Sequence, residues 1–280
     1  MAKGIGLIGN FRGKVGNMVG YNLKDSNNKQ TQGVRVYQPV VKNPKSYAQA
    51  EQRAKLAPIN ATYRALKPII DRGQESKAYG NKSRLAWLKS ALKSYNGTWF
   101  EKGSVVNYPV LVELTKGSLA TQFTFSASDD RLTMVASITA AGDTPTVGEI
   151  STGLIAKYPL LKDGDQITFV AVGSVVNGGL ISDVRSFIVD STSTTAADDA
   201  FSVDGSNLVV ELGLDTADAI AVICSREGDG GQHLRNTVAL KATSSYPESS
   251  TWDASKELAI HSYMAGGVSS DWPEEQIPSV

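Results

Sequence analysis

The sequence predicts an α+β protein with a basic, extended or hairpin N-terminal arm, then a helical pair, then an antiparallel β-sandwich. Three observations lead to this prediction. Glycine is frequent near the N-terminus, apolar residues then recur at spacings of three and four, and from about residue 105 they recur at a spacing of two. Spacings of three and four are typical of a helix face, and a spacing of two is typical of a half-buried strand. We therefore divide the chain into segments 1–45, 46–97 and 105–245 and a C-terminal tail, 246–280.

The first segment, 1–45, is predicted to be either a flexible arm or a docked hairpin. Its glycines at positions 4, 6, 9, 13, 16 and 20 are too frequent for a stable helix. Val15–Leu23 and Gly33–Val41 can pair as two strands, joined by the polar stretch 24–32. A segment with so few core residues of its own is ordered mainly by what it binds, so the sequence leaves both alternatives open.

The second segment, 46–97, is predicted to form two antiparallel helices. Ser46-Tyr-Ala-Gln49 fits the capping-box pattern at the start of the first helix, and Pro58 predicts a kink or a break inside it. Asn81 or Ser83 is expected to cap the second helix, and Trp87 to lie at the edge of the pair or against the next domain. The predicted apolar faces consist of Leu56, Ile59, Tyr63, Leu66 and Ile70 in the first helix and of Leu85, Leu88, Leu92 and Tyr95 in the second.

The third segment, 105–245, is predicted to be the sandwich, because short runs of period two alternate with turn-forming clusters and no helical pattern lies between them. The tail, 246–280, contains Trp252, Tyr263 and Trp272 and is too aromatic for a solvated tail. We expect parts of it to pack on a neighbour. The predicted strands are residues 122–126, 132–138, 166–172, 184–189, 207–212, 219–224 and 237–241.

Charge is divided unequally along the chain. Residues 1–95 contain 18 Lys and Arg and 4 Asp and Glu, a balance of +14, whereas residues 96–280 contain 10 and 24, a balance of −14. So basic a segment needs counter-charge from nucleic acid, from an anionic surface or from the acidic part of another copy. The charge pattern therefore predicts a protein that assembles with other copies of itself or with other components.

The basic N-terminal part supplies the candidate contact residues. Aromatic residues such as Tyr21 and Tyr37 are interleaved among its cations; unpaired bases stack on such rings while cations bind phosphates. A basic surface that docks on acidic protein explains the pattern equally well, and no motif of a sequence-specific nucleic-acid binder is present. The candidate residues, for nucleic acid or for a neighbouring subunit, are Arg12, Lys14, Lys24, Lys29, Arg35, Lys42, Lys45, Arg53 and Lys55.

No catalytic, metal or cofactor site is predicted, and we expect that the protein is not an enzyme. Gly9-Asn-Phe-Arg-Gly13-Lys-Val15 has three residues between its glycines, where a phosphate-binding P-loop has four, and Val15 replaces the hydroxyl residue. The two histidines and Cys224 lack the spacing of a zinc site. Asp163-Gly-Asp165 is expected to be a plain turn rather than a weak calcium site. Cys224 lies in an apolar run and is predicted to be a buried, unreactive thiol.

Two runs near the N-terminus carry a resemblance: Gly6-Leu-Ile-Gly-Asn-Phe-Arg-Gly-Lys-Val-Gly-Asn-Met-Val-Gly-Tyr21 and Asn43-Pro-Lys-Ser-Tyr-Ala-Gln-Ala-Glu-Gln-Arg53. Over roughly residues 4–60 they resemble the opening of an uncharacterised family of gut anaerobes and their phages or prophages. Tyr21-Asn22 departs from the Trp-Lys-like pair that is usual there. The family has no assigned activity, so the resemblance implies no site residues, but its phage association implies a virion component.

The sequence therefore predicts a structural protein of a phage particle, with its basic arm against neighbouring subunits or nucleic acid. Two alternatives stay open: a non-virion protein that binds or packages nucleic acid, and a carbohydrate-binding or adhesive module that uses Trp252, Tyr263 and Trp272. The expected partners are copies of this chain or other virion proteins. The N-terminus lacks the apolar run of a signal peptide, and no stretch is long enough for a membrane span. We therefore expect synthesis in a host cytoplasm and localisation in the virion.

Overall fold

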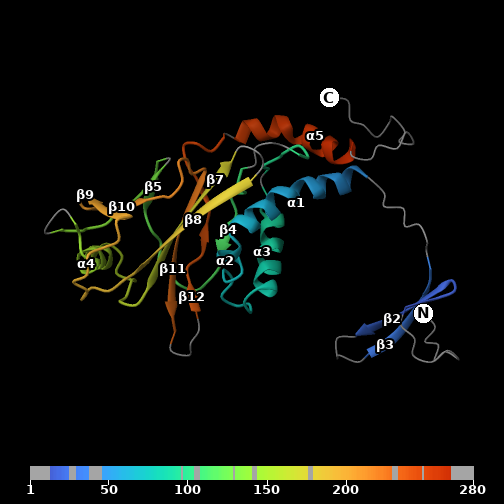
Figure 1. Ribbon diagram of the computed structural model, residues 1–280, viewed down its shortest axis with the longest axis horizontal. Helices are drawn as coiled ribbons and strands as arrows, with labels where there is room; N and C mark the ends of the chain where they lie inside the picture. Colours follow the sequence, from blue (N-terminus) through green and yellow to red (C-terminus); the bar gives the residue numbers. More distant parts are fainter. Residues whose placement is uncertain are drawn as a thin grey trace. The chain divides into compact units, whose positions relative to one another are not determined.

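The computed structural model describes residues 13–24, 30–37, 46–95, 97–103, 108–128, 130–140, 144–175, 179–228, 233–247 and 249–265 (Figure 1). The chain divides into two compact units, Met1–Pro44 and Lys45–Val280. The prediction of an α+β protein with antiparallel sheets is confirmed, because the first unit contains an antiparallel sheet and the second contains helices together with further antiparallel sheets.

The first unit contains a three-stranded antiparallel sheet in which β2 lies between β1 and β3. Its strands are β1 (Gly13–Val15), β2 (Met18–Lys24) and β3 (Gln30–Val36). Gly16 has a positive φ of 58° in the turn between β1 and β2, a conformation that glycine adopts without steric cost. The described residues therefore form strands, as in the hairpin alternative, and we call β1–β3 the N-terminal hairpin.

Three helices form a layer at the start of the second unit: α1 (Tyr47–Ala65), α2 (Lys67–Ile70) and α3 (Asn81–Lys93). The break expected at Pro58 occurs instead at Leu66, because α1 continues through the proline. The Thr62 hydroxyl donates to the Pro58 carbonyl oxygen and accepts from the Val110 N–H, both at 3.0 Å. Tertiary contacts on the buried side of α1 therefore hold the helix together past its proline.

The helix ends differ from the predicted caps. Ser46 precedes α1, but its side chain makes no capping hydrogen bond, so the predicted capping box is wrong. Gly80, rather than Asn81 or Ser83, precedes α3. Ser83 is fully buried instead, and its hydroxyl donates to the Ile70 carbonyl oxygen at 2.7 Å. This serine joins α3 to α2 and does not cap a helix.

Most of the described part of the predicted tail is a helix, α5 (Ser249–Ala265), which packs on α1. Ala259 and Ile260 of α5 are fully buried in a cluster with Ala54 of α1. At the other end of the contact, the Tyr47 hydroxyl donates to the Glu257 carboxylate at 2.8 Å. Burial and the Glu257 carboxylate together raise the pKa of Tyr47 to about 12. This part of the tail thus packs on a helix of its own chain.

The centre of the second unit is an antiparallel sheet of order β12-β11-β7-β8, with β14 on the same edge of β11 as β12. Successive side chains of β7 and β11 alternate between two buried clusters, one on each face of the sheet. Both faces of these two strands are therefore covered. The bounds are β7 (Gln166–Val175), β8 (Gly179–Ile188), β11 (Ala219–Glu227), β12 (His233–Arg235) and β14 (Lys241–Ala242); β4 (Glu113–Thr115) pairs with β13 (Val238–Ala239) beside them.

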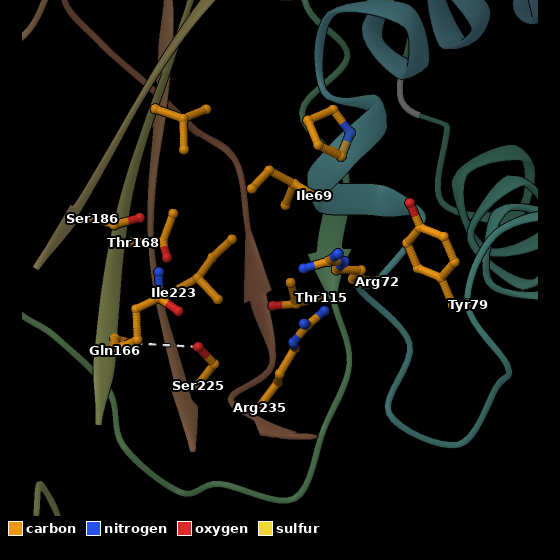
Figure 2. Close-up of a pocket in the computed structure, with 12 residues that line it drawn as sticks. Ile69, Arg72, Tyr79, Thr115, Gln166, Thr168, Ser186, Ile223, Ser225 and Arg235 are labelled. Carbon is orange, nitrogen blue, oxygen red and sulfur yellow. Dashed lines mark hydrogen bonds between the residues drawn. The ribbon is translucent and has the colours of Figure 1, made fainter. Parts of the chain in front are cut away.

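The helices cover one face of this central sheet. Val170 and Val172 of β7 share a buried cluster with Ile223 of β11 and Trp87 of α3. Trp87 is 1% exposed and packs against the sheet, which is the second of its two predicted positions. The helical cover ends near Ile223, where a pocket of about 300 Å³ opens against the same face of the sheet, beside α2 (Figure 2).

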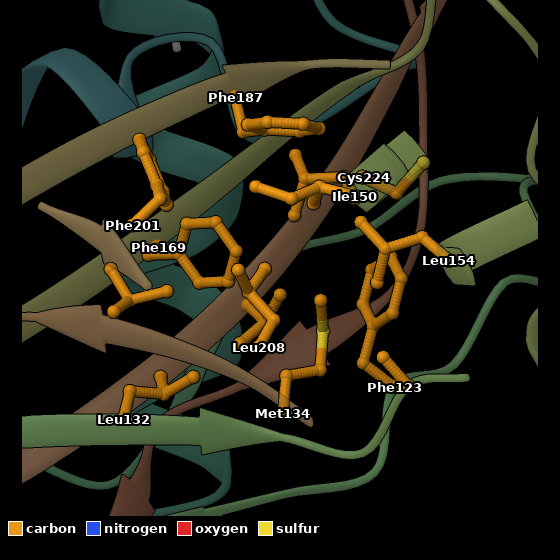
Figure 3. Packing of buried hydrophobic residues seen from close by; sticks show 14 of the residues in the cluster. Phe123, Leu132, Met134, Ile150, Leu154, Phe169, Phe187, Phe201, Leu208 and Cys224 are labelled. Carbon is orange, nitrogen blue, oxygen red and sulfur yellow. The ribbon is translucent and has the colours of Figure 1, made fainter. Parts of the chain in front are cut away.

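A second antiparallel sheet, of order β5-β6-β10-β9, shares a hydrophobic core with the other face of the central sheet. Figure 3 shows Met134 of β6 and Leu208 of β10 close to Phe169 of β7. The Phe201 ring lies 5.9 Å from that of Phe169 and 5.4 Å from that of Phe187. The strands of this sheet are β5 (Phe125–Ala127), β6 (Arg131–Met134), β9 (Phe201–Asp204) and β10 (Asn207–Glu211).

A helix, α4 (Val147–Lys157), lies in the segment predicted to contain only strands, so the prediction that no helix lies there is wrong. Its start is a capping box: the Thr146 hydroxyl accepts from the Glu149 N–H at 3.2 Å, and the Glu149 carboxylate accepts from the Thr146 N–H at 2.8 Å. A Cβ at Gly153 would lie only 2.6 Å from the Ile138 Cα. Since glycine is a poor helix former, close packing and the capping box stabilise α4 rather than intrinsic propensity.

One buried ion pair joins the turn before β7 to the end of β11. Arg226 Nε lies 2.6 Å from Asp165 Oδ1, and Arg226 Nη2 lies 2.7 Å from Asp165 Oδ2. The Asp165 side chain is 1% exposed and that of Arg226 is 21% exposed. The Lys162 N–H also donates to Asp165, at 2.8 Å. Arg226 of β11 thus neutralises the carboxylate of Asp165, which lies in the turn that the sequence predicted.

Arg226→Met removes the cation and leaves the Asp165 carboxylate buried. Because removing one partner of a buried ion pair typically costs 3–5 kcal/mol, we expect the free energy of unfolding to fall by about 3 kcal/mol or more at pH 7. The matched control is Arg131→Met, which breaks the exposed pair with Asp130 and is expected to cost less than about 1 kcal/mol. Urea unfolding followed by circular dichroism measures both. Equal losses in the two variants would contradict the structural role of the buried pair.

Candidate functional site

The N-terminal hairpin presents cations on one face. The strand register pairs Lys14 with Val19 and Val19 with Arg35, and residues paired directly across antiparallel strands lie on the same face. Lys14 and Arg35, both exposed, therefore flank Val19 on one side of the sheet. Tyr21 lies on this side too, two positions along β2 from Val19. We call this the cationic face (Lys14, Val19, Tyr21 and Arg35).

Two tyrosine rings contact neighbouring residues on the cationic face. The Lys14 Nζ lies 3.6 Å from the centroid of the Tyr37 ring, which is a cation–π contact. The Tyr21 ring lies over Gly33, because a Cβ built there would be 2.7 Å from Tyr21 Cζ. Any larger residue at position 33 would displace that ring. The glycine and the two tyrosines therefore position the side chains around Lys14 and Arg35.

The opposite face of the hairpin is apolar, and its side chains are exposed. Met18 pairs with Val36, and Gly20 pairs with Val34. Met18 is 38% exposed, Val34 is 52% exposed and Val36 is 73% exposed. None of the buried hydrophobic clusters in the described stretches takes a member from residues 13–37. We call Met18, Val34 and Val36 the apolar face; a small sheet with such a face needs something to pack against it.

The structure brings only some of the candidate cations together. Lys14 and Arg35 share the cationic face, and Lys24 is the last residue of β2. Arg53 and Lys55 lie in α1, in the second unit, where Lys55 Nζ pairs with the Glu51 carboxylate at 2.7 Å. The other candidates lie outside the described residues: Arg12, Lys29, Lys42 and Lys45.

The aromatic residues considered for glycan binding give no exposed platform in the described stretches. Tyr263 packs against the cluster between α1 and α5, and burial raises its pKa. Trp252 lies in α5, within a stretch whose side chains are not described, and Trp272 lies outside the described residues. The carbohydrate-binding alternative therefore has no observation in its favour.

The acidic residues considered for a metal have protein partners. The Asp163 carboxylate accepts from the Ser191 N–H at 2.7 Å and from its hydroxyl at 2.8 Å, and Asp165 pairs with Arg226. Within the described stretches, no three His, Cys, Asp or Glu side chains are close enough to hold a metal ion. The helices of those same stretches include none with the length and hydropathy to span a membrane.

Comparison with known proteins gives no relative. No protein-family model, no curated protein and no solved structure matches the chain. The resemblance of the N-terminal residues to a phage-associated family therefore stays a prediction.

Sequence reasoning listed the cations of the hairpin but missed its apolar face. The signal was present, because Gly33-Val-Arg-Val-Tyr37 alternates apolar Val34 and Val36 with polar and aromatic residues. That alternation predicts a half-buried strand. Net charge identifies only the cationic face of this strand, because Val34 and Val36 contribute no charge.

The single cysteine provides a test of the packing behind the central sheet. Cys224 is fully buried, and burial, with the charge of Asp165 as a smaller contribution, raises the pKa of its thiol to about 12. We expect a disulfide reagent such as DTNB to modify it several thousandfold more slowly, or slower still, in native protein than in guanidinium, because reaction requires opening that costs about 5 kcal/mol or more. Absorbance of the released thiolate measures the rate. Rapid modification of native protein at pH 8 would contradict the burial of Cys224.

Proposed function

We propose that the protein is a structural, non-catalytic subunit of a phage particle, in which the hairpin of one copy binds a neighbouring copy. The observation that carries this proposal is the uncovered apolar face of Met18, Val34 and Val36. A two- or three-stranded sheet gains independent stability only when one of its faces is packed. A hairpin whose apolar side chains are exposed within the described residues is suited to burying them against a partner.

The cationic face favours an acidic protein partner. The unit Met1–Pro44 contains seven Lys and Arg and one Asp, a balance of +6. Residues 96–280 of the same sequence have a balance of −14. A second copy of the chain therefore offers the complementary charge, and long-range attraction of this kind speeds association.

The contact between copies is heterologous, because a basic segment of one chain meets an acidic region of the next. Such head-to-tail contacts either close into a ring or continue into an array. Rings and arrays of one subunit are the building units of particles. The phage assignment itself is supported by the resemblance of residues 4–60 to a family found in gut anaerobes and their phages, and localisation in the virion follows from it.

The apolar face is tested by Val34→Asp combined with Val36→Asp. Burying a valine contributes about 1.5 kcal/mol or more, so we expect the double variant to weaken self-association at least tenfold. Sedimentation velocity over a range of concentrations measures this. The matched control is Leu160→Asp, at a residue of the second unit whose exposure, 55%, is close to the 52% of Val34. Wild-type protein that stays monomeric at every concentration, or a double variant that assembles like wild type, would overturn the proposal.

The cationic side is tested by reversing Arg12, Lys14 and Arg35 to Glu. Contacts between exposed charges are screened over about 8 Å at physiological salt, so we expect wild-type assembly to weaken as salt rises and the triple variant to assemble poorly even at low salt. Reversal of Arg64, Lys82 and Lys89, which are exposed on α1 and α3, changes the net charge equally and serves as the control. Light scattering measures assembly. Identical behaviour of the two triple variants would mean that net charge, not the hairpin, controls association.

The nucleic-acid alternative makes a different prediction for the same proteins. It requires binding of single-stranded or duplex nucleic acid with steep salt dependence, lost on deletion of residues 1–45. Nucleic-acid binding by a chain that never self-associates would replace the assembly proposal with a packaging role. Electron microscopy of the purified protein distinguishes ordered rings or arrays from such complexes.

A further inference from the structure

A pocket of about 300 Å³ lies on the helix-facing side of the central sheet, where the helical cover ends (Figure 2). Under the helices this face carries buried Val170 and Val172. Beyond them the same strands carry mainly polar side chains, in two rows that pair across the strands. One row consists of Arg235, Ser225 and Gln166, and the other consists of Ile223, Thr168 and Ser186. The floor of the pocket is therefore mainly polar, at the point where the helices no longer cover the sheet.

The walls of the pocket combine apolar and hydroxyl groups. Pro68 and Ile69 of α2 form one side, and Val184 of β8 lies on the opposite side. Thr115 of β4 and Tyr79, in the connection between α2 and α3, complete the lining. Ligand pockets in proteins have this composition, with apolar walls and a few polar groups that converge on the ligand.

Two arginines from distant parts of the sequence meet in this pocket. Figure 2 shows the side chains of Arg72 and Arg235 pointing toward one another beside Thr115. Burial lowers the pKa of Arg235, and the positive charge of Arg72 lowers it further. A guanidinium nevertheless stays protonated in proteins. Two like charges thus face one another, an arrangement that an anion between them would stabilise.

Among the described residues, no carboxylate forms an ion pair with either guanidinium group. None of the ion pairs within the described stretches includes Arg72 or Arg235. The charge of Glu75 attracts Arg235, but its carboxylate oxygens accept from the Ser118 N–H at 2.8 Å, the Ser118 hydroxyl at 2.8 Å and the Arg235 main-chain N–H at 3.1 Å. Burial acts to raise the pKa of Glu75, but these hydrogen bonds outweigh it and lower that pKa. Glu75 is therefore engaged elsewhere, and the pocket keeps a net positive charge.

We propose that this pocket binds a small organic molecule that carries a phosphate group. A phosphate dianion neutralises both guanidinium groups and can accept paired hydrogen bonds from each. The Thr168 hydroxyl provides a further donor on the floor, whereas the hydroxyls of Thr115 and Ser225 donate to the main-chain carbonyls of Asn236 and Gln166. The apolar side formed by Pro68, Ile69 and Val184 accommodates the organic part of the ligand. The pocket lies entirely within the second unit and is independent of the hairpin and its partner.

Isothermal titration of the full chain with phenyl phosphate, inorganic phosphate and succinate tests this proposal. We expect phenyl phosphate to bind at one site per chain and more tightly than the other two, because it supplies both the dianion and an apolar body. Arg72→Met removes one exposed guanidinium and is expected to weaken binding at least about tenfold, the usual effect of losing a hydrogen bond to a charged group. Arg64→Met, an exposed substitution of the same kind in α1 outside the pocket, should leave binding unchanged.

A second variant separates the pocket from general charge. Thr168→Val preserves the volume of the floor and removes one hydroxyl, so it should weaken phenyl phosphate binding several-fold without changing the melting temperature by more than a few degrees. Absence of saturable binding by all three probes in the millimolar range would overturn the proposal. Tighter binding of succinate than of phenyl phosphate would overturn the phosphate assignment. Equal weakening by Arg64→Met and Arg72→Met would show that the anion binds elsewhere.

Discussion

Burial of β7 and β11 on both faces is the constraint on which the second unit depends. Neighbouring residues of β7 such as Phe169 and Val170 are both fully buried although their side chains point to opposite sides of the sheet. Each side therefore needs its own cover. Helices α1, α2 and α3 cover one side, and the β5-β6-β10-β9 sheet with α4 covers the other. The helices and the strands consequently form one unit rather than two domains joined by a linker.

The N-terminal hairpin also has an apolar face that needs a cover. Within the described residues, no buried hydrophobic cluster includes that face. Its strands also separate apolar from polar side chains, with Val34 and Val36 on one face and Lys14 and Arg35 on the other. In the second unit the apolar residues of β7 and β11 are covered on both faces, whereas Val36 is 73% exposed. The contrast within one chain supports an external cover for the hairpin. Exposed valines on a short sheet are a cost to an isolated monomer and a source of affinity in an assembly.

Periodicity predicted most of the strands, because a spacing of two needs only local sequence. It failed for α4, where Gly148 and Gly153 lower helix propensity and are explained only by close contacts with Ser193 and Ile138. The capping pair Thr146 and Glu149 was the one local signal that could have revealed this helix. Charge counting found the basic region, but it could not separate Lys14 and Arg35 on one hairpin face from Arg53 and Lys55 in α1. The pocket beside α2 could not be predicted from the sequence, because Arg72 and Arg235 are far apart along the chain and only the fold brings them together.

Burial decides how the two positive sites of the molecule behave. Lys14 and Arg35 are exposed, so the field they create is weakened by salt and acts mainly on the rate at which partners meet. Arg235 is half-buried beside apolar Ile223, and its charge is screened less by ions and felt more strongly by whatever enters the pocket. The first kind of charge suits the proposed contact between subunits. The second kind suits the proposed binding of one anion in the pocket.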